Sequence, residues 1–320
     1  MKGKTESGMD DSEKIKRLAE DYQRAQSALE ALNQTYVSEE YLLGRKIWET
    51  WWLRFIGRAY DLGRTLKSKT PFGSRRVNID PPFENNIQYQ DTLALYDYKI
   101  AIYTCIVGQY DRPQEPHFKP GNVDYLMVTD GAFPSGGAWE RIDIRTIKGL
   151  PDLDPSRVSR YVKLHPHLFL KEYDYSIYID GNIKTVGDLR YLIHLLNPYG
   201  FAASLHRHRT CVYEELEQCL RLAKDDPQAM RRQIEAYRQA GMPEQYGLLE
   251  ANLLVRDHHN PACVEIMQRW WREIVRHSRR DQLSLPFVLW EMGIPVSQIG
   301  RVSNNVHKIP SIRIALHPGG

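Results

Sequence analysis

The stretch from Tyr173 to Asn182, Tyr-Asp-Tyr-Ser-Ile-Tyr-Ile-Asp-Gly-Asn, constrains the fold of this 320-residue chain more than any other. Residues 175–179 have the length and the β-branched and aromatic content of a buried central strand. Ligands of open α/β sheets bind at the carboxyl ends of the strands, and this end carries Asp180 and Gly181 before Asn182. A carboxylate and an amide oxygen around a glycine suit a hard divalent cation on a diphosphate. The alternative is an ordinary Asp-Gly-Asn turn, which needs no ligand.

Strand-like and helix-like stretches alternate through residues 93–320, which we expect to form the main domain. Helices are expected at 156–170, with Ser156 as a possible cap, and at 189–196, 261–277 and 282–290, and residues 212–240 are expected to form one or two helices. Strands are expected at 99–107, 123–129, 139–147, 175–179, 201–205 and 248–256. Strands that alternate with helices predict an α/β fold with a mostly parallel sheet flanked by helices.

The first 92 residues differ from the rest and predict a helical extension. Residues 1–40 combine a polar tail with an amphipathic helix over 12–32, whose spacing suits pairing with a second chain. Residues 41–92 combine a basic helix over 41–69, rich in tryptophan, with a proline-containing linker. Such a helix suits an anionic membrane surface. The alternative is that its aromatic stripe docks on the main domain.

Composition limits the compartment and the partners. A net charge of +3 gives no sign of a general nucleic-acid binder. Four cysteines without a CxxC spacing predict reduced thiols in a cytosolic setting. The sequence has no signal-peptide core and no apolar run of membrane-spanning length. We therefore expect a cytoplasmic protein, held peripherally on the inner face of the membrane through residues 41–69.

Several familiar catalytic signatures are missing, and polar residues at strand ends and helix starts remain. The chain has no GxxxxGK[ST], no GxGxxG after its first strand, no GxSxG and no HExxH. The stretch from Thr104 to Asp111 could present backbone groups and an aromatic ring to a base, or form a plain turn. Arg160, Lys163 and His167 are spaced to share one helix face, which suits a pyrophosphate or a solvated surface.

Three further patterns carry alternatives of the same kind. His206 and His208 alternate in a basic loop, where they either ligate a metal or lie on the surface. Glu250 and Asn252 alternate on an apolar strand and need partners, either sugar hydroxyls or an internal network. Asp281 either caps the helix that follows it or acts as a carboxylate beside a sugar or an oxocarbenium-like centre.

Taken in order, these pieces resemble one family over about residues 96–300. It is the glycosyltransferase-like domain of plant mucilage-related and turgor-related proteins and of bacterial polysaccharide gene clusters, long catalogued as a domain of unknown function. The strings that carry the resemblance are YTCIVGQYD, VDYLMVTD, RYVKLHPH, YDYSIYIDGN, CVYEE, GLLEANLLVR and SRRDQLSLPFVLW.

The resemblance implies the nucleotide-diphospho-sugar transferase fold known as GT-A, in which a DxD motif holds Mn²⁺ or Mg²⁺ on the donor diphosphate. Asp180 to Asn182 match this motif, with Asn182 in place of the second acid, which puts metal affinity in question. Such enzymes often supply a late histidine to the metal, so His307 is the candidate and His317 the alternative.

The resemblance also implies roles for the other candidates. Asp281 and Glu250 would be the catalytic acids, and the pair Asp281–Gln282 is similar to one that lies beside the donor sugar in retaining enzymes. The residues expected to bind the donor are Thr104, Arg160, Lys163, Asp180, Gly181, Asn252 and Gln282.

The function expected on these grounds is transfer of a sugar from a nucleotide-diphosphate donor to a glycan or lipid-linked acceptor in polysaccharide biosynthesis, assisted by a divalent metal. One alternative is a non-catalytic GT-A-like partner protein, which the missing second acid favours. The other is a metal-dependent hydrolase of a lipid or sugar linkage.

Overall fold

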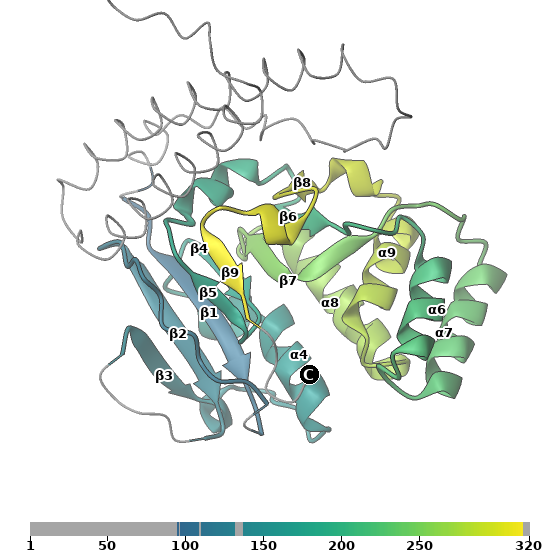
Figure 1. Cartoon of the computed structure of the whole chain (residues 1–320), viewed down its shortest axis with the longest axis horizontal. Helices are drawn as coiled ribbons and strands as arrows, with labels where there is room; N and C mark the ends of the chain where they lie inside the picture. Colours follow the sequence, from purple (N-terminus) through teal and green to yellow (C-terminus); the bar gives the residue numbers. More distant parts are fainter. Residues whose placement is uncertain (1–94, 96, 109, 132–136, 316–320) are drawn as a thin grey trace, which may run out of the picture. The chain divides into compact units, whose positions relative to one another are not determined.

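A computed structural model of the chain describes residue 95 and residues 97–108, 110–131 and 137–315 (Figure 1). The helices expected over residues 12–32 and 41–69, the linker after them and His317 lie outside the described residues.

A seven-stranded sheet forms the centre of the described part, in the order β3-β2-β1-β4-β7-β6-β8. The strands β3, β2, β1 and β4 run parallel to one another, β6 is parallel to β8, and β7 is antiparallel to both β4 and β6. The predicted α/β fold with a mostly parallel sheet is therefore confirmed. The strands are β1 (Ile100–Ile106), β2 (Val123–Thr129), β3 (Trp139–Asp143), β4 (Tyr175–Ile179), β6 (Phe201–Leu205), β7 (Leu249–Arg256) and β8 (Gly300–Arg301).

Helices cover one face of this sheet, and short elements cover the other. The longer helices are α4 (Pro155–Leu164), α6 (Val212–Arg221), α7 (Pro227–Gln239), α8 (Pro261–Arg276) and α9 (Asp281–Glu291). Side chains of α4, α8 and α9 share one apolar core with Tyr103 of β1 and Tyr178 of β4. The helices α8 and α9 lie side by side, with α6 and α7 beyond α9 (Figure 1).

A second apolar core lies on the opposite face of the sheet. There Ile102 and Ile177 pack with residues of η2 (Arg190–Leu195) and η4 (Val306–Lys308). A two-stranded sheet of β5 (Ile183–Thr185) and β9 (Ile312–Ile314) contributes to this core. The remaining short elements are α5 (Pro166–Phe169), η1 (Ile144–Thr146) and η3 (Val296–Gln298).

Two expected elements are shorter than the sequence predicted. The helix expected over 156–170 is two helices, because Pro166 has no N–H to continue the hydrogen-bond ladder beyond His165. Ser156 is not its cap: Asp154 accepts a hydrogen bond from the N–H of Arg157, and the helix begins at a proline. The strand expected over 139–147 stops at residue 143, where η1 begins.

The reversed direction of β7 places its beginning at the edge of the sheet that carries Asp180. Because β7 is antiparallel to β4, its first residues lie beside the carboxyl end of β4. The N–H of Asp180 donates to the carbonyl oxygen of Asn252 at 2.9 Å. The pairing with β6 slips between Ala203 and Ser204, so that Ser204 faces Glu250. Direction and slip together bring Glu250 and Asn252 to the edge that carries Asp180.

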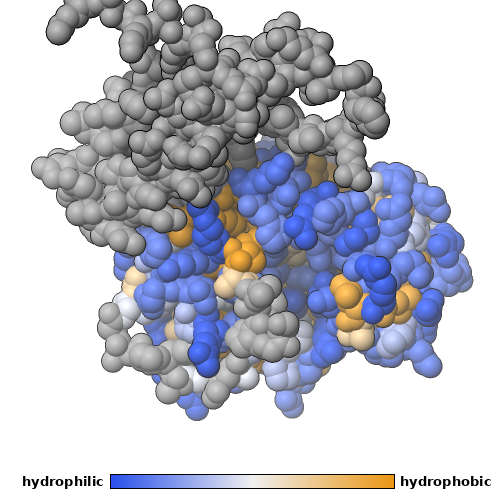
Figure 2. Space-filling view, in the orientation of Figure 1, coloured by the Kyte–Doolittle hydropathy of each residue, from blue (hydrophilic) through white to orange (hydrophobic). Residues whose placement is uncertain are grey.

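The surface of the described part is mainly hydrophilic. On the face shown in Figure 2, apolar residues form small separate patches. The large apolar side chains with substantial exposure are scattered along the chain, at Tyr98, Tyr110, Leu153, Leu168, Leu222 and Val275. Among the described residues, no helix has both the length and the apolar character that crossing a membrane requires. All four cysteines are buried with free thiols.

Candidate active site

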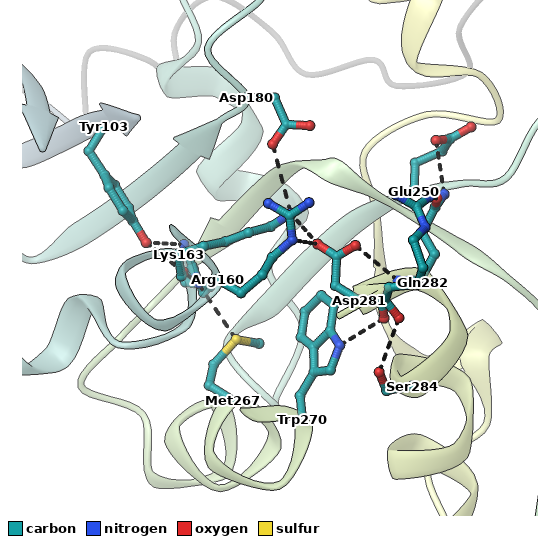
Figure 3. Close-up of polar contacts among 12 residues, drawn as sticks. Tyr103, Arg160, Lys163, Asp180, Glu250, Met267, Trp270, Asp281, Gln282 and Ser284 are labelled. Atoms are coloured by element: carbon teal, nitrogen blue, oxygen red, sulfur yellow. Dashed lines mark hydrogen bonds and ion pairs between the residues drawn. The ribbon is translucent and has the colours of Figure 1, made fainter. Parts of the chain in front are cut away.

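Two cations and one carboxylate form a buried cluster between α4 and α9 (Figure 3). The Lys163 ammonium lies 2.7 Å from Oδ2 of Asp281, and Nε of Arg160 lies 3.0 Å from the same oxygen. The side chains of Lys163 and Asp281 are only 1% and 5% exposed. The alternative of a solvated basic face on α4 is therefore wrong for Lys163.

The surrounding packing fixes the ends of both helices that form this cluster. The hydroxyl of Tyr103 and Nη1 of Arg256 both donate to the carbonyl oxygen of Lys163, at 2.7 and 2.6 Å. These donors satisfy a carbonyl at the carboxyl end of α4, which has no partner within the helix. Across the cluster, Nε1 of Trp270 donates to the carbonyl oxygen of Asp281 at 2.9 Å.

Asp281 is not a helix cap, which was one of the two roles that the sequence left open. Arg280 occupies the cap position, and Asp281 is the first residue of α9. Burial alone would raise the pKa of Asp281, but Arg160, Lys163 and Arg280 outweigh burial and hold that pKa well below its usual range. A carboxylate between two cations stays ionised, so Asp281 acts as their fixed counter-charge.

The Asp180–Asn182 turn lies next to this cluster. The carboxylate of Asp180 is 3.8 Å from the Lys163 ammonium, and its side chain is 30% exposed. Asn182 holds the chain beyond β9: its Nδ2 donates to the carbonyl oxygen of Ala315, and the N–H of Ala315 donates to the carbonyl oxygen of Asn182, both at 2.9 Å. One predicted metal ligand thus faces the charged cluster, and the amide of the other is engaged in a structural contact.

Asp111 is a site residue that the sequence reasoning missed. A Cβ on Gly181 would lie 2.9 Å from the Cβ of Asp111 and 3.1 Å from its Oδ2. Only a glycine permits this approach, which brings a second carboxylate against the turn between Asp180 and Asn182. The available signal was the strand-end string that closes with Asp111, because the carboxyl ends of the adjacent parallel strands β1 and β4 meet at one edge.

The donor set fits a cation that is shared with a diphosphate. Mg²⁺ in such sites takes one or two protein carboxylates and completes its shell with phosphate oxygens and water, and Asp180 and Asp111 supply two carboxylates around Gly181. Within the described ranges, no group of three or more His, Cys, Asp and Glu side chains could hold a metal by itself. His307 is exposed. Partial burial is the largest cause that lowers its pKa, and the charges of Arg207 and His208 lower the pKa further. Its role as a metal ligand stays a prediction.

A second polar group surrounds Glu250 on the far side of Asp281. Nε2 of Gln282, the residue after Asp281 on α9, donates to Oε2 of Glu250 at 3.3 Å (Figure 3). Nε2 of His206 lies 3.9 Å from Oε1 of Glu250, and the His206 side chain is 6% exposed. Burial raises the pKa of Glu250. The surface interpretation of the histidine loop is thus wrong for His206.

Two other predicted donor-binding residues, Thr104 and Asn252, have buried side-chain oxygens without a hydrogen-bond partner among the described residues. Thr104 follows Tyr103 on β1, and because side chains alternate along a strand it faces away from α4. Its buried hydroxyl has no hydrogen-bond partner among the described residues. Oδ1 of Asn252 is likewise buried without one. His167 belongs to α5 and packs beside His165, so it does not continue the face of Arg160 and Lys163.

An α/β sheet with charged side chains gathered at the carboxyl ends of its central strands defines a class of proteins that bind ligands at that edge. The model of the TOD1/MUCI70, glycosyltransferase-like domain matches residues 75–305, and the chain belongs to this family. The resemblance noted in the sequence is therefore confirmed, and the chain is a glycosyltransferase-like protein.

Other comparisons add little. No curated protein matches the chain. Among solved structures it is similar to the WbbM bifunctional glycosyltransferase in its apo form, with 12% identity and a TM-score of 0.39. That similarity covers 65% of this chain and 39% of the other. A likeness this weak carries no argument about fold or activity.

Proposed function

We propose that this protein transfers a sugar from a nucleotide-diphosphate donor to a hydroxyl group of a glycan or lipid-linked acceptor in polysaccharide biosynthesis. The observation that carries the proposal is the position of the Lys163 ammonium, which lies 2.7 Å from Asp281 and 3.8 Å from Asp180. A buried cation at the edge of the sheet, already balanced by one acid and close to a half-exposed second one, suits a diphosphate that gains charge as it departs.

The reaction has two requirements, stabilisation of the leaving diphosphate and removal of the acceptor proton, and different residues would meet them. The bond between the anomeric carbon and the diphosphate oxygen breaks, and its electron pair leaves with the nucleoside diphosphate. The acceptor oxygen bonds to the anomeric carbon and loses its proton. Lys163 and Arg160 stabilise the charge on the leaving group. Mn²⁺ or Mg²⁺ held by Asp180 and Asp111 would supply further charge neutralisation when bound.

Glu250 is the better candidate for the acid that takes the acceptor proton. A general base must be able to change its protonation state near the working pH. Asp281 lies between two cations that hold its pKa low, whereas burial raises the pKa of Glu250. Glu250 is in contact with the backbone of Arg207 and the neutral amide of Gln282, with the His206 ring beside it. The proton released by the acceptor therefore goes to Glu250.

The setting of the reaction rests on the sequence of the first 92 residues. The basic, tryptophan-rich stretch 41–69 supports a peripheral position on the cytoplasmic face of a membrane, where lipid-linked acceptors are found. The amphipathic stretch 12–32 supports pairing between copies of the chain.

A non-catalytic partner protein is the second candidate, and one observation favours it. The amide of Asn182 stands where a second acid would ligate a metal, and its Nδ2 is engaged with Ala315. A protein of this kind would retain the fold without binding a nucleotide sugar.

A thermal-shift screen of the whole protein against UDP, GDP, CDP and their sugars, with and without Mn²⁺, separates the two candidates. A ligand at about 100 times its Kd stabilises the folded state by about 2.7 kcal/mol. We expect one nucleotide to raise the melting temperature in a metal-dependent way, and Asp180→Asn to abolish that rise.

Asp174→Asn is the matched control, because Asp174 is exposed, precedes the same strand and bonds the N–H of Lys99 at the opposite edge. The control variant should respond as the wild type does. Cooperative melting of the wild type with no response to any nucleotide would favour the non-catalytic candidate. Release of free sugar from a glycan without nucleotide would instead indicate a hydrolase.

A further inference from the structure

The imidazole ring of His206 is fixed from one side by the backbone of its own loop. Its Nδ1 accepts hydrogen bonds from the N–H groups of His208 at 3.3 Å and Arg209 at 3.0 Å. The N–H of His206 itself donates to the carbonyl oxygen of Leu248 at 2.9 Å, immediately before β7. The ring is therefore oriented by two backbone donors, the third contact fixes the main chain of His206, and the Nε2 edge of the ring faces the acids.

These contacts determine where the ring carries its proton. Because Nδ1 accepts two backbone donors, a neutral His206 bears its hydrogen on Nε2. Burial lowers the pKa of His206 to about 4, so the ring is neutral at pH 7. Nη2 of Arg209 approaches Nε2 at 3.2 Å, but the two backbone donors on Nδ1 outweigh this one side-chain donor. Arg209 has another partner in Glu215, at 2.5 Å.

Nε2 lies between two carboxylates that differ in how many other partners they have. It is 3.8 Å from Oε2 of Glu215 and 3.9 Å from Oε1 of Glu250. Glu215 already pairs with Arg209 and accepts from the thiol of Cys219. Glu250 has no such ion pair with Arg or Lys among the described residues, so it is the acid that gains from a further donor.

Other groups on the histidine loop and on α9 also act on Glu250. Nε2 of Gln282 donates to Oε2, and Nη2 of Arg280 donates to Oε1 of Gln282 at 3.1 Å, which fixes the orientation of that amide. Burial has the largest effect on the pKa of Glu250 and raises it, as does the charge of Glu215. The charges of Arg207 and Arg209 and a hydrogen bond from the Arg207 backbone lower that pKa. Gln282 thus holds Oε2, and Oε1 is the oxygen nearest to the His206 ring.

We propose that His206 is a positioning residue that donates its Nε2–H to Glu250 and holds this acid in the ionised form required of a general base. The separation of 3.9 Å is longer than a hydrogen bond, and contacts of this kind tighten when a catalytic site is occupied. The role of Glu250 rests on the proposed function. The link between the ring and the acid does not, because it can be measured without any substrate.

The test compares two variants, one that keeps only the acceptor at the place of Nδ1 and one that keeps the donor at the place of Nε2. In His206→Asn the amide oxygen replaces Nδ1 for the backbone donors, but no group reaches Glu250. In His206→Gln the amide nitrogen replaces Nε2. Carboxyl titration of Glu250 is followed by carbon-13 NMR of the full-length protein and assigned with Glu250→Gln. We expect the midpoint to move to higher pH in His206→Asn and to stay near the wild-type value in His206→Gln.

A transfer assay adds a second readout that a purely structural role would not move. The acidic limb of the kcat/KM profile should shift to higher pH in His206→Asn, with recovery at alkaline pH, and His206→Gln should restore the wild-type limb. An unchanged Glu250 midpoint in folded His206→Asn would overturn the inference.

Two further outcomes separate this inference from the proposed function. If His206→Asn fails to fold, nitrogen-15 spectra of the wild-type ring decide, since a ring protonated on Nδ1 contradicts the proposal. If the Glu250 midpoint shifts in His206→Asn but the wild-type protein transfers no sugar, the link between His206 and Glu250 is supported and the proposed function is contradicted.

Discussion

Asp281 begins α9 and Glu250 accepts a hydrogen bond from the next residue, Gln282, yet the surroundings of the two acids are opposite. Asp281 contacts both Lys163 and Arg160 and is 5% exposed. Glu250 is 14% exposed and faces a neutral amide and a neutral imidazole. An acid with two fixed cations organises its neighbours, whereas an acid without them can exchange a proton. The two carboxylates, equal candidates in the sequence, are therefore suited to different tasks.

Because their surroundings differ, substitution of Asp281 and substitution of Glu250 should have different consequences. Removing one partner from a buried ion cluster leaves charge without compensation, and this lowers stability. Removing Glu250, which has no ion pair with Arg or Lys among the described residues, removes chemistry without leaving such a charge. Substitutions at the two positions should therefore separate stability from activity.

The largest effect is expected from Glu250→Gln on transfer. A general base contributes about 10²- to 10⁴-fold to a rate, and an amide keeps the shape but cannot take the proton. We expect kcat to fall by about that factor while the melting temperature stays close to that of the wild type. Steady-state kinetics and thermal denaturation on the same preparation measure both quantities. A fall in kcat of less than about threefold would show that another group takes the proton.

The next effect is expected from Asp281→Ala on stability. Breaking a buried ion pair by removing one partner costs about 3–5 kcal/mol, and here Lys163 and Arg160 would both lose their shared oxygen. We expect the free energy of unfolding, measured by urea denaturation, to fall by about this amount.

Glu235→Ala is the control for this loss, because Glu235 pairs with Arg238 on the surface of α7 with its side chain 53% exposed. Exposed pairs contribute about 0–1 kcal/mol. Equal losses in the two variants would contradict the assignment of Asp281 as the counter-charge of a buried cluster.

Much of the fold could be predicted because apolar periodicity is a local property. The strands expected at residues 123–129, 175–179 and 201–205 occur with the same bounds. The direction of β7 could not be predicted, because an apolar run is the same whichever way it crosses the sheet. Its reversal nonetheless brings Glu250 to the site.

The candidate site was harder to predict because its contacts join distant residues. The spacing of Arg160 and Lys163 indicated a shared face, but it also fitted a solvated helix. The partner that decides between them, Asp281, lies 118 residues beyond Lys163. In the same way, only the close approach of Asp111 to Gly181 reveals a second carboxylate beside Asp180.

The smallest effect is expected from two buried histidines, and it limits how the pH dependence of Glu250 can be interpreted. Burial lowers the pKa values of His165 and His258 to about 4. In His258, Nε2 contacts the carbonyl oxygen of Leu170, and Nδ1 is buried with no partner among the described residues. A second proton on this ring would have no acceptor.

Because the unfolded chain takes up these protons near pH 6.5 and the folded chain only near pH 4, the stability that the neutral rings provide is present above pH 6.5 and is lost as the pH falls toward 4. For the two rings together, the loss between pH 7 and pH 6 is about 1 kcal/mol. Urea denaturation at the two pH values measures it, and His258→Gln should reduce the difference. The exposed His208, changed to Gln, should not alter it. If His258→Gln keeps the full pH dependence, other groups cause the acid instability. The acidic limb of the kcat/KM profile then reports the protonation of Glu250 only at pH values where the protein remains folded.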